Sequence, residues 1–111
     1  MCIFCKIVAG DLPARKVYED ELVLGFEDLH PVAPLHYLFI PKKHVVNAID
    51  AAAHPGLMDA VFGGIRALVL EQGLEEDGIR LVSNVGERAG QSVFHYHVHV
   101  LGGRDMHWPP G

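Results

Sequence analysis

The spacing of apolar positions predicts a short helix at the start of the chain. Ile3, Phe4 and Ile7 are separated by steps of one, three and four residues, which places them on one helical face. These residues alternate poorly for a strand, in which every second side chain would share a face. Gly10 and Pro13 then predict the end of the helix.

A longer helix is predicted from about Pro55 to Gln72. Pro55 suits the first turn of a helix, and Gly73 suits the position just past its end. Gly63 and Gly64 weaken its middle by about 1 kcal/mol each relative to alanine, and a close packing contact would explain them. The apolar stripe of this helix recurs at steps of three and four: Met58, Val61, Phe62, Ile65, Leu68 and Val69.

Short stretches rich in β-branched and aromatic residues predict strands over 17–19, 22–27, 36–42, 78–84 and 93–101. The last two are joined by the polar connection 85–91, which predicts an antiparallel pair. The segment 28–34 has two prolines and no periodicity, and we expect a loop there. The order helix, strands, helix, strands predicts an α+β fold with a mainly antiparallel sheet.

The last predicted strand, VFHYHVHVL, carries three histidines at alternate positions. Because side chains alternate between the faces of a strand, His95, His97 and His99 are expected on one face, about 6.6–7 Å apart in successive steps. The histidines would then line a rim or a cleft. The opposite face would carry apolar side chains into the core, namely Phe94, Tyr96, Val98 and Val100.

Chemistry alone allows three interpretations of this histidine row. In the first, the rings are solvated on an exposed face, although three polar rings pack poorly on a strand. In the second, they hold a catalytic metal, but neighbours on one flat strand converge poorly on one ion. In the third, a neutral imidazole attacks phosphorus and forms a covalent intermediate. Nearby donors would then hold the phosphate oxygens and protonate the leaving group.

Polar residues around the connection 85–91 supply such donors. Gln91 and Ser92 directly precede the histidine strand, and Asn84 ends the strand before it. The connection contains two glycines, and a glycine-containing turn can aim backbone N–H groups at an anion. Each residue alone is typical of a surface turn, but together they flank the same strand.

Composition narrows the class of protein. A chain of 111 residues suits one compact domain with one core. The formal charge of −5, without a basic block, argues against strong binding to nucleic acid. We find no secretory signal and no apolar stretch near the ~20 residues of a membrane span, so we expect a cytoplasmic protein. Cys2 and Cys5 are then expected to stay reduced.

The histidine strand and its surroundings resemble the histidine triad (HIT) family. The family pattern is His, apolar, His, apolar, His and two apolar residues, which HYHVHVL matches with only Tyr96 partly polar. The stretches IFCKI, FEDLHPVAPLHYLFIPKKH and GQSVFHYHVHVLGGRDMHWPPG resemble the Hint branch, the purine nucleoside phosphoramidases. The likeness covers nearly the whole chain, so residues 1–111 are identified as one HIT domain.

The resemblance implies a role for each polar residue of the site. His97, the middle histidine of the motif, would be the nucleophile and would accept AMP as a nucleotidyl-histidine. A backbone carbonyl would hold its other ring nitrogen and fix the tautomer. His99 would sit beside the phosphate, Ser92 near the leaving group, and His36 would be an outlying histidine that assists. His95 would either support the site or bind a metal.

The resemblance also implies a nucleotide pocket. Asp28 would accept hydrogen bonds from the ribose hydroxyls, and Asn84 and Gln91 would lie near phosphate oxygens, with Gly90 in the same turn. Ser92, His97, His99 and Trp108 would complete the polar side of the pocket and its lid. The purine would contact the apolar residues Ile3, Phe4, Ile7, Phe26 and Leu29. From the residues alone, core packing explains the first three of these equally well.

The family fold implied is an antiparallel meander sheet with two helices, paired across a two-fold axis into one continuous sheet. In such a homodimer the C-terminal segment crosses to the partner's active site. Trp108 would then contact the leaving group in the other subunit's pocket. A tail packed on its own subunit is the alternative.

The pair Cys2-x-x-Cys5 allows three interpretations. A thioredoxin-like redox pair normally opens a helix after a strand, and no strand precedes it here. Two ordinary thiols on a short helix is the second interpretation. The third is half of a structural zinc site, which needs four nitrogen or sulfur ligands. Some bacterial relatives with a similar start complete this site with histidines that correspond here to His44 and His95. Such a zinc would be structural, and no cofactor would be required for catalysis.

The residues and the resemblance together predict hydrolysis of the P–N bond of AMP or GMP phosphoramidates, including nucleotidyl-lysine. The alternatives are a dinucleoside polyphosphate hydrolase, a nucleotide-binding regulatory protein, and a protein that binds metal directly with the histidine row. The expected partners are a purine nucleotide or its phosphoramidate and a second copy of the chain.

Overall fold

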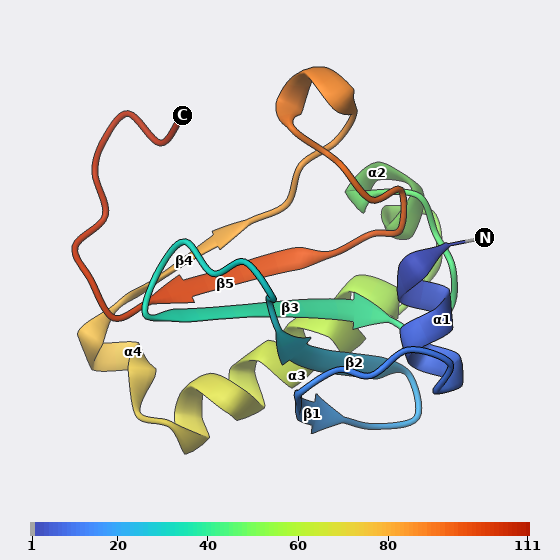
Figure 1. Ribbon diagram of the computed structural model, residues 1–111, viewed down its shortest axis with the longest axis horizontal. Helices are drawn as coiled ribbons and strands as arrows, with labels where there is room; N and C mark the ends of the chain where they lie inside the picture. The colour runs from blue at the N-terminus through green and yellow to red at the C-terminus, as the bar shows by residue number, and fades with distance from the viewer. Residues whose placement is uncertain (1) are drawn as a thin grey trace.

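Figure 1 shows the computed structural model of the chain, which describes residues 2–111. A five-stranded antiparallel sheet has the order β1-β2-β3-β5-β4, so the predicted α+β fold is confirmed. The strands are β1 (Lys16–Glu19), β2 (Val23–Glu27), β3 (Leu35–Pro41), β4 (Ile79–Val82) and β5 (Val98–Gly102). The helices are α1 (Ile3–Ala9), α2 (Ala48–Ala52), α3 (Leu57–Glu71) and α4 (Leu74–Asp77), with a 3₁₀ turn η1 (Glu87–Ala89).

Helix α1 forms where the apolar spacing predicts it. Cys2 caps its first turn, since its Sγ accepts the N–H of Cys5 at 3.4 Å. Gly10 ends the helix with a φ of 84°, a left-handed conformation that residues with a Cβ rarely adopt. Phe4 and Ile7 are buried, so the helix packs two apolar side chains against the rest of the protein.

Helix α3 begins later than predicted. A left-handed glycine precedes it, so Pro55 lies before the helix rather than in its first turn. Gly64 packs closely, because a Cβ there would come within 2.9 Å of the Tyr18 ring, whereas Gly63 has no such contact. The expected close contact therefore explains one glycine of the pair. Phe62 leaves the predicted stripe, with 42 % of its surface exposed.

The sheet is covered differently on its two faces. Side chains alternate along β2 and β3, so α3 packs on one face and α1 on the other. His99 of β5 pairs with Leu38 of β3, and directly opposed side chains share a face. The ring of His99 therefore lies on the α1 face. The core under α1 consists of Phe4, Ile7, Leu24, Phe26, Leu38 and Ile40.

Strand β5 is shorter than predicted, so the three histidines do not all lie in one strand, although Phe4 of α1 packs against both His95 and His97 and the ring of His99 adjoins that of His97. Only His99 lies in the strand, while His97 lies in the irregular segment before it and His95 in a bend. The backbone there bonds to the loop after β3 instead of to a strand: the N–H of Tyr96 donates to the carbonyl of Val45 at 2.7 Å. Each histidine therefore has different surroundings.

The remaining differences concern short elements. The structure has four α-helices, whereas the resemblance implied two. The additional helices α2 and α4 are too short for an apolar repeat to be visible in the sequence. Strand β4 ends earlier than predicted, at Val82. Phe94, expected in the core, has 42 % of its surface exposed, whereas the other three residues of that predicted face are buried. Among residues 2–111, no helix is long and apolar enough to cross a membrane.

Candidate active site and a neighbouring metal-ligand cluster

The backbone holds His97 in one tautomer. Its Nδ1–H donates to the carbonyl of His95 at 2.7 Å, which confirms the predicted contact. In the neutral ring the Nε2 then carries the lone pair, and this atom has no hydrogen-bond partner among residues 2–111. The ring is buried, and Phe4 packs edge-on against it with the ring centroids 5.2 Å apart. His97 thus presents an oriented nitrogen.

His36 and His99 form a hydrogen-bonded pair beside His97. The Nδ1 of His36 accepts the N–H of Val32 at 3.1 Å, so the proton of His36 lies on its Nε2. This Nε2–H donates to the Nδ1 of His99 at 2.8 Å, which leaves the proton of His99 on its own Nε2. The ring centroids of His97 and His99 are 5.1 Å apart. A proton donor therefore stands next to the oriented nitrogen.

Asp28 borders this pair. Its Oδ2 lies 3.3 Å from the Nε2 of His36, and its Oδ1 accepts the N–H of His30 at 2.8 Å. Burial lowers the pKa of His36, although the carboxylate opposes the shift. Burial, assisted by the neighbouring histidines, lowers the pKa of His99 to about 4. Both rings are therefore neutral near pH 7, as their hydrogen bonds require.

His97 and His99 line a hollow of about 310 Å³. Its wall is largely apolar, a composition typical of small-molecule sites. The hollow brings together most of the residues predicted to bind a nucleotide: Ile3, Phe4, Ile7, Phe26, Asp28, Leu29, Ser92, His97 and His99. The sequence analysis missed other lining residues: Pro13, Ala14, Glu27, His30, Leu38 and Val93. For His30 a signal existed, since an aspartate two residues earlier favours a turn that accepts its N–H.

A second hollow adjoins the first at His99. Asn84, one of the two side chains predicted near phosphate oxygens, follows β4 and lines this second hollow together with the apolar Val82 and Leu101. Asp28 and His99 line both hollows. The proton donor of the site therefore stands where the two hollows meet.

Gln91, Gly90 and Trp108 line neither hollow. The amide of Gln91 is buried and engaged by the chain itself: its Oε1 accepts the N–H of Gly86 at 2.9 Å, and its Nε2 donates to two backbone carbonyls at 2.7 and 3.1 Å. It holds the turn in place, which differs from the expected direct phosphate contact. Gly90 ends η1 with a φ of 95°. Trp108 has 82 % of its surface exposed in the single chain.

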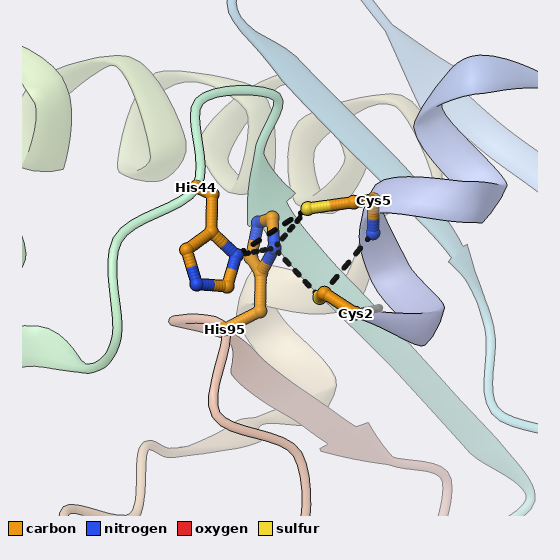
Figure 2. A group of neighbouring side chains, drawn as sticks. All are labelled: Cys2, Cys5, His44 and His95. Atoms are coloured by element: carbon orange, nitrogen blue, oxygen red, sulfur yellow. Dashed lines mark hydrogen bonds between the residues drawn. The ribbon is translucent and has the colours of Figure 1, made fainter.

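Cys2, Cys5, His44 and His95 meet beside α1, where their ligand atoms all lie within 4.8 Å of one another (Figure 2). We refer to these four residues as the Cys₂His₂ cluster. The Nδ1 of His95 lies 3.4 Å from the Sγ of Cys2 and 3.6 Å from that of Cys5. The Nδ1 of His44 lies 3.3 Å from the Sγ of Cys5 and 3.2 Å from the Nδ1 of His95. The fold thus gathers the four residues that the resemblance implies.

The Cys₂His₂ cluster fits a tetrahedral metal. Zinc bonds to nitrogen and sulfur imply tetrahedral edges of about 3.3 Å between two nitrogens and about 3.5 Å between nitrogen and sulfur. The distances above match these edges. The Nε2–H of His95 donates to the carbonyl of Pro41 at 2.8 Å, so its Nδ1 lone pair faces the sulfurs. Burial lowers the pKa of His95, which favours the neutral ring that a metal requires.

An antiparallel α+β sheet that brings His97 and His99 of the motif HYHVHVL to one hollow is typical of the class of histidine-triad proteins. The HIT domain pattern matches residues 9–106, and the chain belongs to the HIT family. The predicted family is therefore confirmed.

Similar proteins cover nearly the whole chain. A crystal structure of a HIT family hydrolase from Legionella pneumophila Philadelphia 1 has a TM-score of 0.94 and 46 % identity, and the match covers 100 % of both chains. A histidine triad protein from Clostridium difficile has a TM-score of 0.90 and 42 % identity, over 96 % of this chain and 93 % of that one. The 14 kDa zinc-binding protein of Zea mays is 45 % identical over 112 residues, 98 % of this chain and 87 % of that protein.

Proposed function

We propose that this chain is a hydrolase that cleaves the P–N bond of purine nucleoside 5′-phosphoramidates, such as AMP or GMP joined to a lysine-like amine. The observation that supports this proposal most strongly is the fixed tautomer of His97, whose ring lines an apolar hollow with Asp28 in its wall. Apolar walls suit a purine, and a carboxylate accepts hydrogen bonds from ribose hydroxyls. The likeness to a protein described as a HIT family hydrolase supports hydrolytic chemistry.

In the first step the Nε2 of His97 attacks phosphorus. A bond from phosphorus to His97 forms, and the bond from phosphorus to the amine breaks. The amine leaves only when its nitrogen is protonated. The anionic phosphate favours one extra proton on the His36–His99 pair, because an opposite charge raises the proton affinity of a histidine. His99 then donates its Nε2–H to the amine, and the pair returns to neutral.

In the second step water attacks the nucleotidyl-histidine. The oxygen of water bonds to phosphorus, and its proton returns to the Nε2 of His99. The bond between phosphorus and His97 breaks, so AMP is released and His97 regains its lone pair. The hydrogen bond from His97 Nδ1 to the His95 carbonyl keeps the attacking nitrogen oriented through both steps.

We propose that the Cys₂His₂ cluster holds a structural zinc. Four protein ligands leave no open position, so the zinc would tie segments of the chain together without entering the reaction. A cytoplasmic location, which keeps thiols reduced, suits such a site. The name of the zinc-binding relative from Zea mays supports the assignment. Metal analysis of protein purified without chelator should give about one zinc per chain. A value near zero would contradict the proposed zinc site.

We also propose a homodimer in which the C-terminal segment contributes to the partner's site. The exposed ring of Trp108 in the single chain supports this arrangement, because large exposed aromatic side chains favour contact sites. Deletion of residues 104–111 should therefore shift the preference among leaving amines while the substrate's nucleotide part stays the same. An unchanged preference would contradict the role of the tail.

A fluorogenic adenosine phosphoramidate tests the proposed function. The protein should release the amine and AMP with turnover, and it should do so faster than it hydrolyses a dinucleoside polyphosphate. A faster reaction with the dinucleoside would favour the alternative hydrolase. Binding of AMP without turnover of either substrate would favour the alternative of a nucleotide-binding regulatory protein.

A further inference from the structure

We propose that the Cys₂His₂ cluster is a positioning element of the nucleotide site, so that metal binding and nucleotide binding strengthen each other through His95 and Phe4. This inference rests on the proposed function. It goes beyond a metal that only stabilises the fold, because it assigns the cluster an effect on nucleotide affinity.

His95 belongs to the cluster and to the active site at once. Its side chain is fully buried, with the Nδ1 facing the sulfurs of Cys2 and Cys5. Its backbone carbonyl accepts the Nδ1–H of His97 at 2.7 Å and so sets the tautomer of the proposed nucleophile. A movement of His95 that follows the loss of a metal therefore moves the group that orients His97.

Phe4 makes the second connection. It stands on α1 between Cys2 and Cys5, and its ring packs edge-on against His95 and His97, with centroid distances of 5.9 and 5.2 Å. The same ring forms part of the wall of the nucleotide hollow. A shift of α1 relative to the cluster thus changes the shape of the hollow and the packing on His97.

The Cys₂His₂ cluster is also the polar link between α1 and the two segments that it faces. Among residues 2–111, the contacts of Cys2 and Cys5 with His44 and His95 are the only hydrogen bonds that join α1 to segments 41–46 and 91–97 (Figure 2). Those two segments are joined to each other separately, through the N–H of Tyr96 and the carbonyl of Val45. Without a metal, α1 is therefore held there only by apolar packing and by these weak thiol–imidazole contacts.

Thermodynamic linkage makes this coupling measurable. If zinc raises the affinity for AMP by some factor, AMP must raise the affinity for zinc by the same factor. We expect a factor of about 5–20, within the range usual for coupled sites. A zinc that only stabilised the fold would leave the AMP dissociation constant of the folded protein unchanged.

The test compares AMP binding by calorimetry in zinc-loaded wild type and in His44→Ala, at a temperature where circular dichroism shows both to be folded. His44 is exposed, so its removal leaves no buried cavity. Lys43→Ala, the adjacent exposed residue, is the matched control and should keep both zinc and AMP affinity. His44→Ala should weaken zinc binding and raise the AMP dissociation constant about 5–20-fold.

Cobalt in place of zinc supplies a second readout in the metal-loaded, folded protein, so the test does not depend on the stability of His44→Ala. AMP should change the visible absorption of the cobalt in wild type, and Phe4→Leu should reduce that change while cobalt stays bound. An unchanged cobalt spectrum at saturating AMP, or equal AMP affinity with and without zinc, would overturn the coupling and leave the proposed function intact. Failure of wild type to bind AMP in either state would instead overturn the proposed function.

Discussion

His95 and His97 are two residues apart, yet the chain gives their rings different surroundings. Each ring donates one N–H to a backbone carbonyl, at 2.8 Å for His95 and 2.7 Å for His97. His95 donates from Nε2, so its Nδ1 faces two sulfurs and a second imidazole. His97 donates from Nδ1, so its Nε2 has no hydrogen-bond partner in the described part of the chain and its ring lines the hollow.

The difference shows that a hydrogen bond to the backbone can give two identical side chains different roles, because it determines which ring nitrogen carries the proton. A neutral imidazole has one donor and one acceptor nitrogen. The carbonyl that accepts the N–H therefore determines which nitrogen carries the lone pair and where that lone pair points. A lone pair beside thiols suits a metal, and a lone pair beside a proton donor suits attack on phosphorus. Changes at the two sites should therefore have effects of different kinds and sizes.

The largest effect is expected from His97→Ala. Turnover of an adenosine phosphoramidate should fall about 10⁴-fold or more, because the covalent route is lost. AMP binding should change only a few-fold, since other side chains make most of the wall of the hollow. Steady-state kinetics and calorimetry measure the two quantities. His54→Ala, a histidine outside the site, serves as the control, and turnover by His97→Ala near that of wild type would remove His97 as the nucleophile.

Metal removal should have the next largest effect, on stability. A ligand that binds only the folded state at 1,000 times its Kd adds about 4 kcal/mol, so a chelator should lower the Tm by about 10–20 °C. Differential scanning calorimetry with and without chelator measures the shift. The double variant Cys2→Ser, Cys5→Ser should melt at one temperature in both conditions. A wild-type Tm that does not respond to chelator would mean that no metal stabilises the fold.

His99→Asn should reduce kcat about 100-fold for an alkylamine leaving group, a size typical of lost general acid catalysis. The loss should be much smaller for an aromatic amine that departs without full protonation. A series of substrates with leaving amines of different basicity, assayed with both proteins, tests the assignment. An equal loss for all leaving groups would show that His99 does not supply the proton.

The smallest effect concerns stability in acid. The pKa of His99 is about 4 in the folded protein and about 6.5 in the unfolded chain. Between these values the unfolded chain binds the extra proton, so stability is full above pH 6.5 and falls as the pH drops toward 4. Wild type should lose on the order of 1–3 kcal/mol more than His99→Asn across this window. Urea unfolding at pH 7 and pH 4.5 measures the difference, and parallel losses would contradict it.

The α+β class, helices α1 and α3 and the five strands could be predicted because apolar periodicity is a local property of the sequence. Most residues around the hollow could be named because the resemblance to the HIT family covers nearly the whole chain. The start of β5 could not be predicted, since the chain before it pairs with a loop at Val45 rather than with a strand. The contact of His95 with the carbonyl of Pro41 was not predicted, and for His97 the resemblance implied a backbone carbonyl without saying which residue supplies it, because a contact to the backbone leaves no residue type to recognise.

The most direct test of the division between the two histidines is to trap the intermediate. The protein is mixed with an adenosine phosphoramidate, quenched in the steady state, digested and examined by mass spectrometry under conditions that preserve bonds from phosphorus to nitrogen. We predict an adenylyl group on His97, and none on His95 or His99. Turnover with the adenylyl group on another residue, or without any adduct, would contradict the account.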